Sequence, residues 1–188
     1  MFKLNIMSVL CVCVALSACQ TTTVSKDVQY TGQDARIRLY GQNQKPTIMT
    51  YEQAGKKIKI NVGGGLGDAF SSMVGSVKNS HIGIAQTQTS LHFQDQNGLL
   101  SKAFYQEFVI PAATAVSVRN GFIGLTNISA SPQQTTVQYQ GSCRGAEMTF
   151  FPKAGKDYEV VANRKGAACG VSIFEVDRSG NTQEISLK

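Results

Sequence analysis

The amino-acid sequence predicts a mainly β protein, folded as an antiparallel sandwich or a partly open barrel with one short helical insertion. Short runs of Val, Ile, Thr, Tyr and Phe recur along the chain of 188 residues, and turn residues separate them. Glycine is abundant and tryptophan is absent. About ten such runs, regularly spaced, favour packed antiparallel sheets in a single domain.

The first three strands are predicted at residues 35–40, 47–51 and 57–62. The first and third alternate between apolar and polar residues, so one face of each is expected in the core. Turns at 41–46 and 53–55 separate the three runs. The later strands are expected at residues 106–110, 115–119, 122–127, 135–140, 146–151, 157–162, 171–177 and 183–187.

Two turns in the C-terminal part predict hairpins. Residues 151–158 contain Gly155, which suits the left-handed backbone of a tight turn, and residues 177–181 form a second turn sequence. Acidic residues near these turns are predicted to face solvent. They form two pairs: Asp157 with Glu159, and Glu175 with Asp177.

A helical insertion is predicted at about residues 63–104. Six apolar residues at helical spacing form one stripe, which is expected to cover an open side of a sheet, although a partner- or membrane-binding helix is an alternative. They are Leu66, Ala69, Phe70, Met73, Val74 and Val77. The glycines at 63–67 are interpreted as a flexible connection, because the Gly-Lys-Ser/Thr of a phosphate-binding loop is missing. Residues 99–104 suggest a second short helix or turn.

Cys143 and Cys169 are the only cysteines after Cys19, and we predict a disulfide between them. The bond would close a loop of about 27 residues and contribute roughly 3–4 kcal/mol. Two buried thiols are the alternative. A redox-active pair is not expected, because no C-x-x-C spacing occurs.

The charge pattern excludes some classes of function. The net charge of +6 is spread along the chain, so a mild preference for anionic surfaces is possible on composition, but the basic stripe with interleaved aromatics of nucleic-acid-binding proteins is missing. We therefore expect no nucleic-acid partner. The densest basic cluster is interpreted as the solvated side of a strand: Lys56, Lys57 and Lys59.

No catalytic, cofactor-binding or metal site is predicted. His81 and His92 are the only histidines, and the sequence lacks both H-E-x-x-H and a G-x-S-x-G nucleophile motif. A zinc site would need a third ligand such as Asp68 or Asp95. An enzyme using His81, His92 and nearby carboxylates is kept as the alternative.

The N-terminus predicts an export signal. Lys3 precedes a mostly apolar run at 4–16, which has the length of a signal-peptide core and is shorter than the about 20 residues of a membrane-spanning helix. Leu16, Ser17, Ala18 and Cys19 close this run. An ordinary secretory signal with small residues at its cleavage site is the rival interpretation.

The sequence Leu16-Ser17-Ala18-Cys19 resembles the lipobox of bacterial lipoproteins. The resemblance implies cleavage between Ala18 and Cys19, and a diacylglyceryl group on the Cys19 thiol, which gives stable anchoring. It divides the chain into a signal peptide at 1–18, a lipidated tether at 19–34 and one β-rich periplasmic domain at 35–188. Because Gln20 stands where Asp would mark inner-membrane retention, the periplasmic face of the outer membrane is implied.

The body also resembles parts of small lipoproteins of Gram-negative bacteria. The strand at 35–40 and the Ala-Gly-Lys-Asp-Tyr run at 154–158 are similar to segments of immunoglobulin-like or transthyretin-like periplasmic domains. The expected function is a non-catalytic structural or binding module of the cell envelope. It is expected to contact the membrane through Cys19 and to have an envelope-protein or cell-wall partner. An accessory lipoprotein of a secretion or surface-appendage complex is a further alternative.

Overall fold

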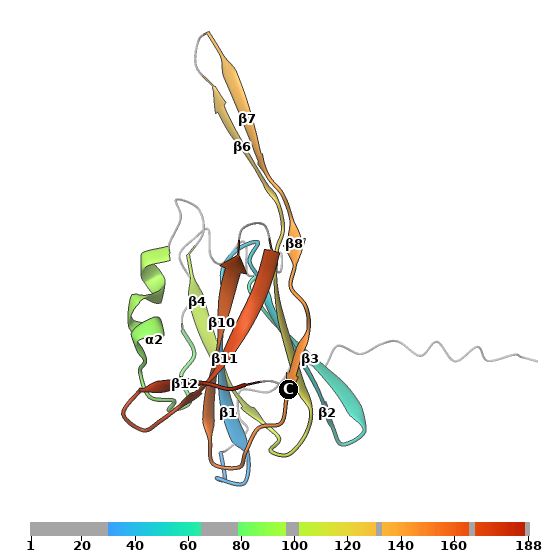
Figure 1. Cartoon of the computed structure of the whole chain (residues 1–188), viewed down its shortest axis with the longest axis vertical. Helices are drawn as coiled ribbons and strands as arrows, with labels where there is room; N and C mark the ends of the chain where they lie inside the picture. The colour runs from blue at the N-terminus through green and yellow to red at the C-terminus, as the bar shows by residue number, and fades with distance from the viewer. Residues whose placement is uncertain (1–29, 65–78, 97–101, 131–132, 166–167, 187–188) are drawn as a thin grey trace, which may run out of the picture.

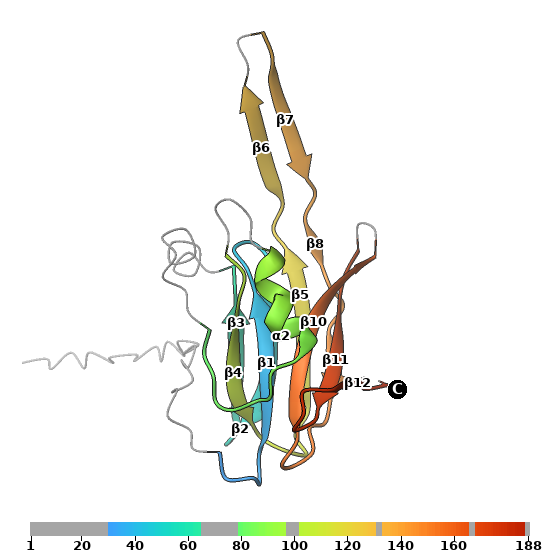
Figure 2. The same cartoon turned by 90° about the vertical axis from the view of Figure 1, so that its left-hand side faces the viewer.

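The computed structural model describes residues 30–64, 79–96, 102–130, 133–165 and 168–186. The predicted signal peptide, Cys19, the tether before residue 30 and the helix at 66–77 lie outside these ranges. Within them the protein is mainly β, as predicted. Two multi-stranded sheets pack as a sandwich, and a short helix lies against one of them (Figures 1 and 2).

The first sheet has the strand order β12-β11-β10-β1-β4. Strand β1 lies between β10 and β4, and it runs parallel to β10, whereas the other pairs in this sheet are antiparallel. The strands are β1 (Ala35–Gly41), β4 (Phe104–Ile110), β10 (Asp157–Lys165), β11 (Ala168–Val176) and β12 (Thr182–Glu184).

The second sheet has the order β3-β2-β5-β8, and β9 also pairs with β5. All its pairs are antiparallel. The strands are β2 (Thr47–Gln53), β3 (Lys56–Val62), β5 (Val116–Phe122), β8 (Cys143–Arg144) and β9 (Met148–Phe150). Two further strands, β6 (Leu125–Ala130) and β7 (Thr135–Gln140), form a separate two-stranded ribbon.

The core fills the space between the two sheets, and strand alternation explains its composition. Residues at every second position of β1 and β5, such as Ile37, Leu39 and Val118, are fully buried. On β3 the alternation leaves the predicted lysines exposed and buries Ile58, Ile60 and Val62. Gly41 ends β1 where a side chain would collide with the Val62 carbonyl group of β3, so glycine is required there.

The predicted hairpin at 151–158 is wrong, although Gly155 does adopt a left-handed conformation with φ of 72°. Strand β9 before this turn belongs to the second sheet, and β10 after it belongs to the first. The turn therefore joins the sheets, because a turn sequence does not fix which sheet the next strand enters. The hairpin at 177–181 is confirmed, since it connects the antiparallel strands β11 and β12.

Residues 79–96, which precede β4, cover the outer face of the first sheet, and we call them the covering segment. It contains α2 (Gln88–His92) and the 3₁₀ helix η1 (Phe93–Gln96). Both lie within the predicted helical insertion at 63–104, although their positions in it were not predicted. Thr87 caps α2 by accepting a hydrogen bond from the Ser90 amide, and the Ser90 hydroxyl accepts from the Thr87 amide in return. The predicted helix or turn at 99–104 lies partly outside the described residues, and its last residue, Phe104, begins β4.

The β2–β3 hairpin gives a first stability prediction. Its two-residue turn is Ala54-Gly55, and both residues have positive φ, at 50° and 71°. Alanine is disfavoured in this conformation, whereas Asn tolerates it, so Ala54→Asn should raise the free energy of unfolding by about 0.5–1 kcal/mol in a urea titration. The control is Ala154→Asn, at an exposed turn alanine without positive φ, which should change stability little. Equal effects of the two changes would contradict the prediction.

Candidate functional site

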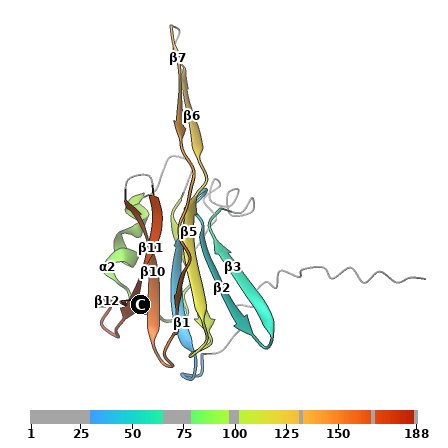
Figure 3. The ribbon, with the colours of Figure 1, turned by 45° about the vertical axis from the view of Figure 1, so that its right-hand side comes forward.

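The ribbon of β6 and β7 is the most distinctive surface feature of the protein. The two strands pair with each other from Leu125 opposite Gln140 to Ala130 opposite Thr135, and no third described strand joins them. Figures 1 and 3 show that the ribbon extends well beyond the end of the sandwich. We call residues 125–140 the arm. A lone two-stranded ribbon is only marginally stable in water, so the arm is suited to a partner that covers it.

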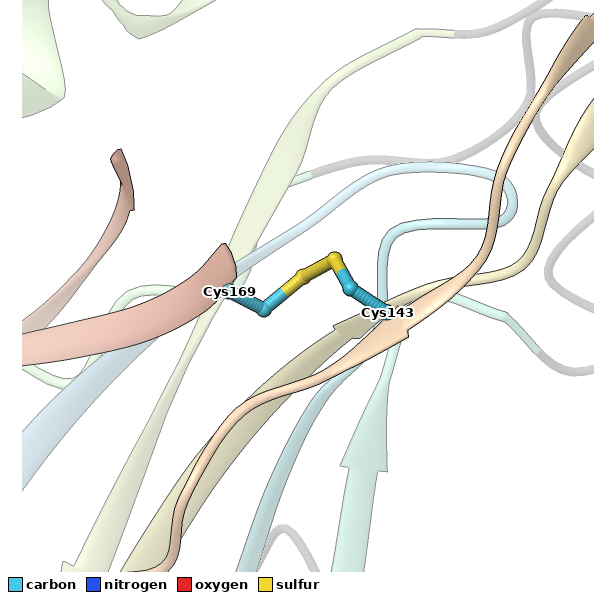
Figure 4. Close-up of a disulfide and its surroundings, with 2 residues drawn as sticks. All are labelled: Cys143 and Cys169. Atoms are coloured by element: carbon cyan, nitrogen blue, oxygen red, sulfur yellow. A yellow bond between two sulfur atoms is a disulfide. The ribbon is translucent and has the colours of Figure 1, made fainter. Parts of the chain in front are cut away.

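The base of the arm is fixed to both sheets. Strand β5 leads into β6, and on the return β8 pairs with the end of β5, where Phe122 is opposite Cys143. The predicted disulfide is present: Cys143 of β8 is bonded to Cys169 of β11, with their Cα atoms 5.7 Å apart (Figure 4). Because β8 and β11 belong to different sheets, the bond joins the sheets where the arm leaves the body.

A cavity of about 230 Å³ lies beside this base. Aromatic and polar side chains line it, among them Tyr40, Phe93, Asn120 and Phe122, together with Cys169. The Asn120 side chain is only 6% exposed, and its Oδ1 atom has no hydrogen-bond partner. The cavity is smaller than the about 300–1,000 Å³ of ordinary small-molecule sites, so it fits at most a small group.

A layer of buried ions lies under the covering segment, on the outer face of the first sheet. Arg38 of β1 is opposite Glu107 of β4 on one side and Glu159 of β10 on the other. Its Nε and Nη2 atoms donate to Glu107 Oε1 at 3.0 and 2.8 Å, and Nη1 lies 3.5 Å from Glu159 Oε2. All three side chains are at most 4% exposed.

The expectation that Asp157 and Glu159 face solvent is therefore wrong. Both lie on one face of β10, as expected, but that face is covered by the segment before β4. Asp157 accepts two hydrogen bonds from Arg36, each 2.7 Å long, so the two acidic residues of β10 pair with the two arginines of β1. For the second acidic pair, Glu175 binds exposed Lys156, and the exposed Asp177 accepts hydrogen bonds within its own turn.

Most other polar groups of this layer have hydrogen-bond partners, whereas the buried Arg38 Nη1 atom makes no hydrogen bond and has only its 3.5 Å approach to Glu159. The Ile82 amide donates to Glu107 Oε2 at 2.7 Å, and Arg38 Nη2 donates to the Ile84 and Ala85 carbonyl groups. Glu159 Oε2 accepts from Tyr40 and Thr87. Burial, reinforced by the charge of Glu159, raises the pKa of the Tyr40 hydroxyl, which therefore stays protonated as a donor.

This arrangement closes the ion layer to solvent and ties the covering segment to the sheet. Charged groups so buried are costly unless each is paired. Here the carboxylates hold the segment in place by accepting from the Ile82 and Ile84 amides and from the Thr87 hydroxyl. The layer is therefore a structural element rather than an accessible site.

The histidines predicted as alternative site residues have separate partners. The Tyr105 hydroxyl lies 3.0 Å from the ring nitrogens of His81, whereas exposed His92 is 3.4 Å from Asp95 in the next helical turn. Asp68 lies outside the described residues. Within the described part of the chain, no three His, Cys, Asp or Glu side chains gather as a metal site would require.

None of the described helices is long and apolar enough to span a membrane.

Comparisons with protein-family models, curated protein sequences and solved structures find no match to this chain. The arm, with the disulfide and the cavity at its base, is thus identified as the candidate functional site by geometry alone.

Proposed function

We propose that this protein is a lipid-anchored, non-catalytic binding module of the cell envelope, and that the arm contacts its partner. The observation that carries the binding role is the ribbon of β6 and β7, which projects from the sandwich without a covering strand among the described residues. The lipobox at 16–19 supports anchoring at the periplasmic face of the outer membrane.

The position of the N-terminus fits this role. The first described strand, β1, starts at the end of the sandwich opposite the arm (Figures 1 and 2). Residues 20–29 between Cys19 and Tyr30 reach at most about 35 Å when fully extended. A lipid on Cys19 would therefore hold the body near the membrane. The anchored end would be the one opposite the arm, so the arm would stay accessible.

Anchoring is tested with Cys19→Ser in the full chain expressed in a Gram-negative host. The wild type should incorporate labelled palmitate and sediment with the outer membrane, and the variant should do neither, because the thiol is the acceptor of the lipid. A variant that remained lipid-labelled and membrane-bound would disprove the anchor.

The binding role is tested by placing a photo-crosslinking amino acid at Thr136 of the arm. The matched control is Thr149 of β9, because both are exposed threonines on strands. Irradiation of intact cells should give a discrete cross-linked species from position 136 and not from position 149. Cross-linking from Thr149 alone, or from neither position, would disprove the arm as the contact element.

A further inference from the structure

The edges of the sandwich are protected against pairing with other strands. Exposed strand edges present unpaired backbone groups, and proteins protect them with charge, short length or cover. The edge strand β3 carries exposed lysines, and β8, β9 and β12 are only two or three residues long. The edge strand β4 is bridged by Ser80, whose amide donates to the Tyr105 carbonyl group.

The arm lacks these protections. Its strands are six residues long, and each is paired along one edge only among the described residues. The stretch 120–143 contains no charged residue, and Pro132 lies in the connection between the strands rather than within either. An uncharged ribbon with two open edges is a template for strand addition.

We propose that the arm pairs edge to edge with the arm of a second copy of this chain, forming a four-stranded antiparallel sheet. The inference rests on the proposed role of the arm as the contact element. Identical arms meet without charge repulsion because they carry no charge, whereas a charged partner strand would find no complementary charge there. The sequence of the arm is also rich in Asn and Gln, residue types that form ladders between identical strands.

The symmetry of such a dimer suits the charge of the body. Antiparallel pairing of one strand with its own copy is two-fold symmetric, so the two bodies lie at opposite ends of the joined arms. Removal of the signal peptide with Lys3 changes the net charge from +6 to 6 − 1 = +5, so each mature chain is positive and this arrangement keeps the two bodies apart. The central residues of the paired strand then face their own copies. Asn127 and Gln138 are the central candidates on the two strands, and they lie opposite each other in the arm.

A charge-exchange experiment tests the proposal with the full-length chain purified in detergent. Wild type should sediment as a concentration-dependent dimer. Gln138→Glu alone and Gln138→Lys alone should each dimerise at least about tenfold more weakly, because like charges would meet across the two-fold axis. An equimolar mixture of the two should recover the dimer. Asn127→Glu and Asn127→Lys test the other edge in the same way, and circular dichroism checks that every variant is folded.

The matched control is the same exchange at exposed Thr149 of β9, which should leave dimerisation unchanged. A wild-type chain that stays monomeric up to the hundred-micromolar range, or a dimer that survives the charge variants on both strands, would overturn the proposal. If the chain is monomeric but Thr136 cross-links to a different protein, the inference falls and the arm remains a binding element. If neither dimer nor cross-link is found, both fall.

Discussion

Arg38→Met should destabilise the protein by about 3–5 kcal/mol at pH 7 in a urea titration, a large part of the stability of a typical domain. The change removes the positive charge between Glu107 and Glu159, which are 4% and 1% exposed. Two carboxylates would then remain buried without a counter-ion.

Two further variants separate charge from packing. Arg36→Met removes the partly exposed partner of Asp157 and should cost only about 1–2 kcal/mol. The charge-free variant R38M/E107Q/E159Q should regain much of the loss, because the Gln carbonyl groups can still accept from the Ile82 amide, Tyr40 and Thr87. Equal costs at positions 36 and 38 would contradict the account.

Removal of the disulfide is the second large prediction. The double variant C143S/C169S should lose about 3–4 kcal/mol of unfolding free energy, because the bond closes a loop between residues separated by 26 positions. The loss should be localised. The variant should increase the amide hydrogen exchange rate at Gly121 and Phe122, where β5 meets β8. The increase at Met49, in the middle of the second sheet, should be smaller.

Chemical reduction provides the control for this prediction. A reductant should lower the unfolding midpoint of wild type to that of C143S/C169S and should leave the double variant unchanged. A difference below about 1 kcal/mol between wild type and the variant would show that the two sheets hold the arm base without the bond.

The sequence predicted the strands in which apolar and polar residues alternate clearly. Residues 35–40 and 57–62 show this alternation, and they form β1 and β3 as expected. The predicted break between 119 and 122 is wrong, because β5 runs through Asn120 and Gly121 to Phe122. These turn-forming residues pair with β2 and β8 instead, so tertiary pairing overrides their local preference.

The helix α2 was missed because only five residues form it, too few to show an apolar period. The reciprocal Thr87 and Ser90 cap was its only sequence signal, since Ser replaces the usual Glu or Gln.

The buried ion layer was missed for a different reason. Carboxylates near turns usually face solvent, and nothing local reveals that a later segment covers them. One signal was available: Arg36 and Arg38 have the same two-residue spacing as Asp157 and Glu159, which is what neighbouring strands in register require. The sequence also marked the arm, because residues 120–143 contain no charged residue.

The parallel pairing of β1 with β10 has a consequence for how the protein folds. Arg36 and Asp157 are 121 positions apart. The first sheet can therefore be completed only when β10, in the last third of the chain, is available to pair with β1. Contacts of such long range slow folding, because a long loop must close before they form. A chain that ends before Asp157 would leave Arg38 without Glu159 and one edge of β1 open. For the exported protein proposed above, the first sheet would therefore be completed only after β10 has crossed the membrane.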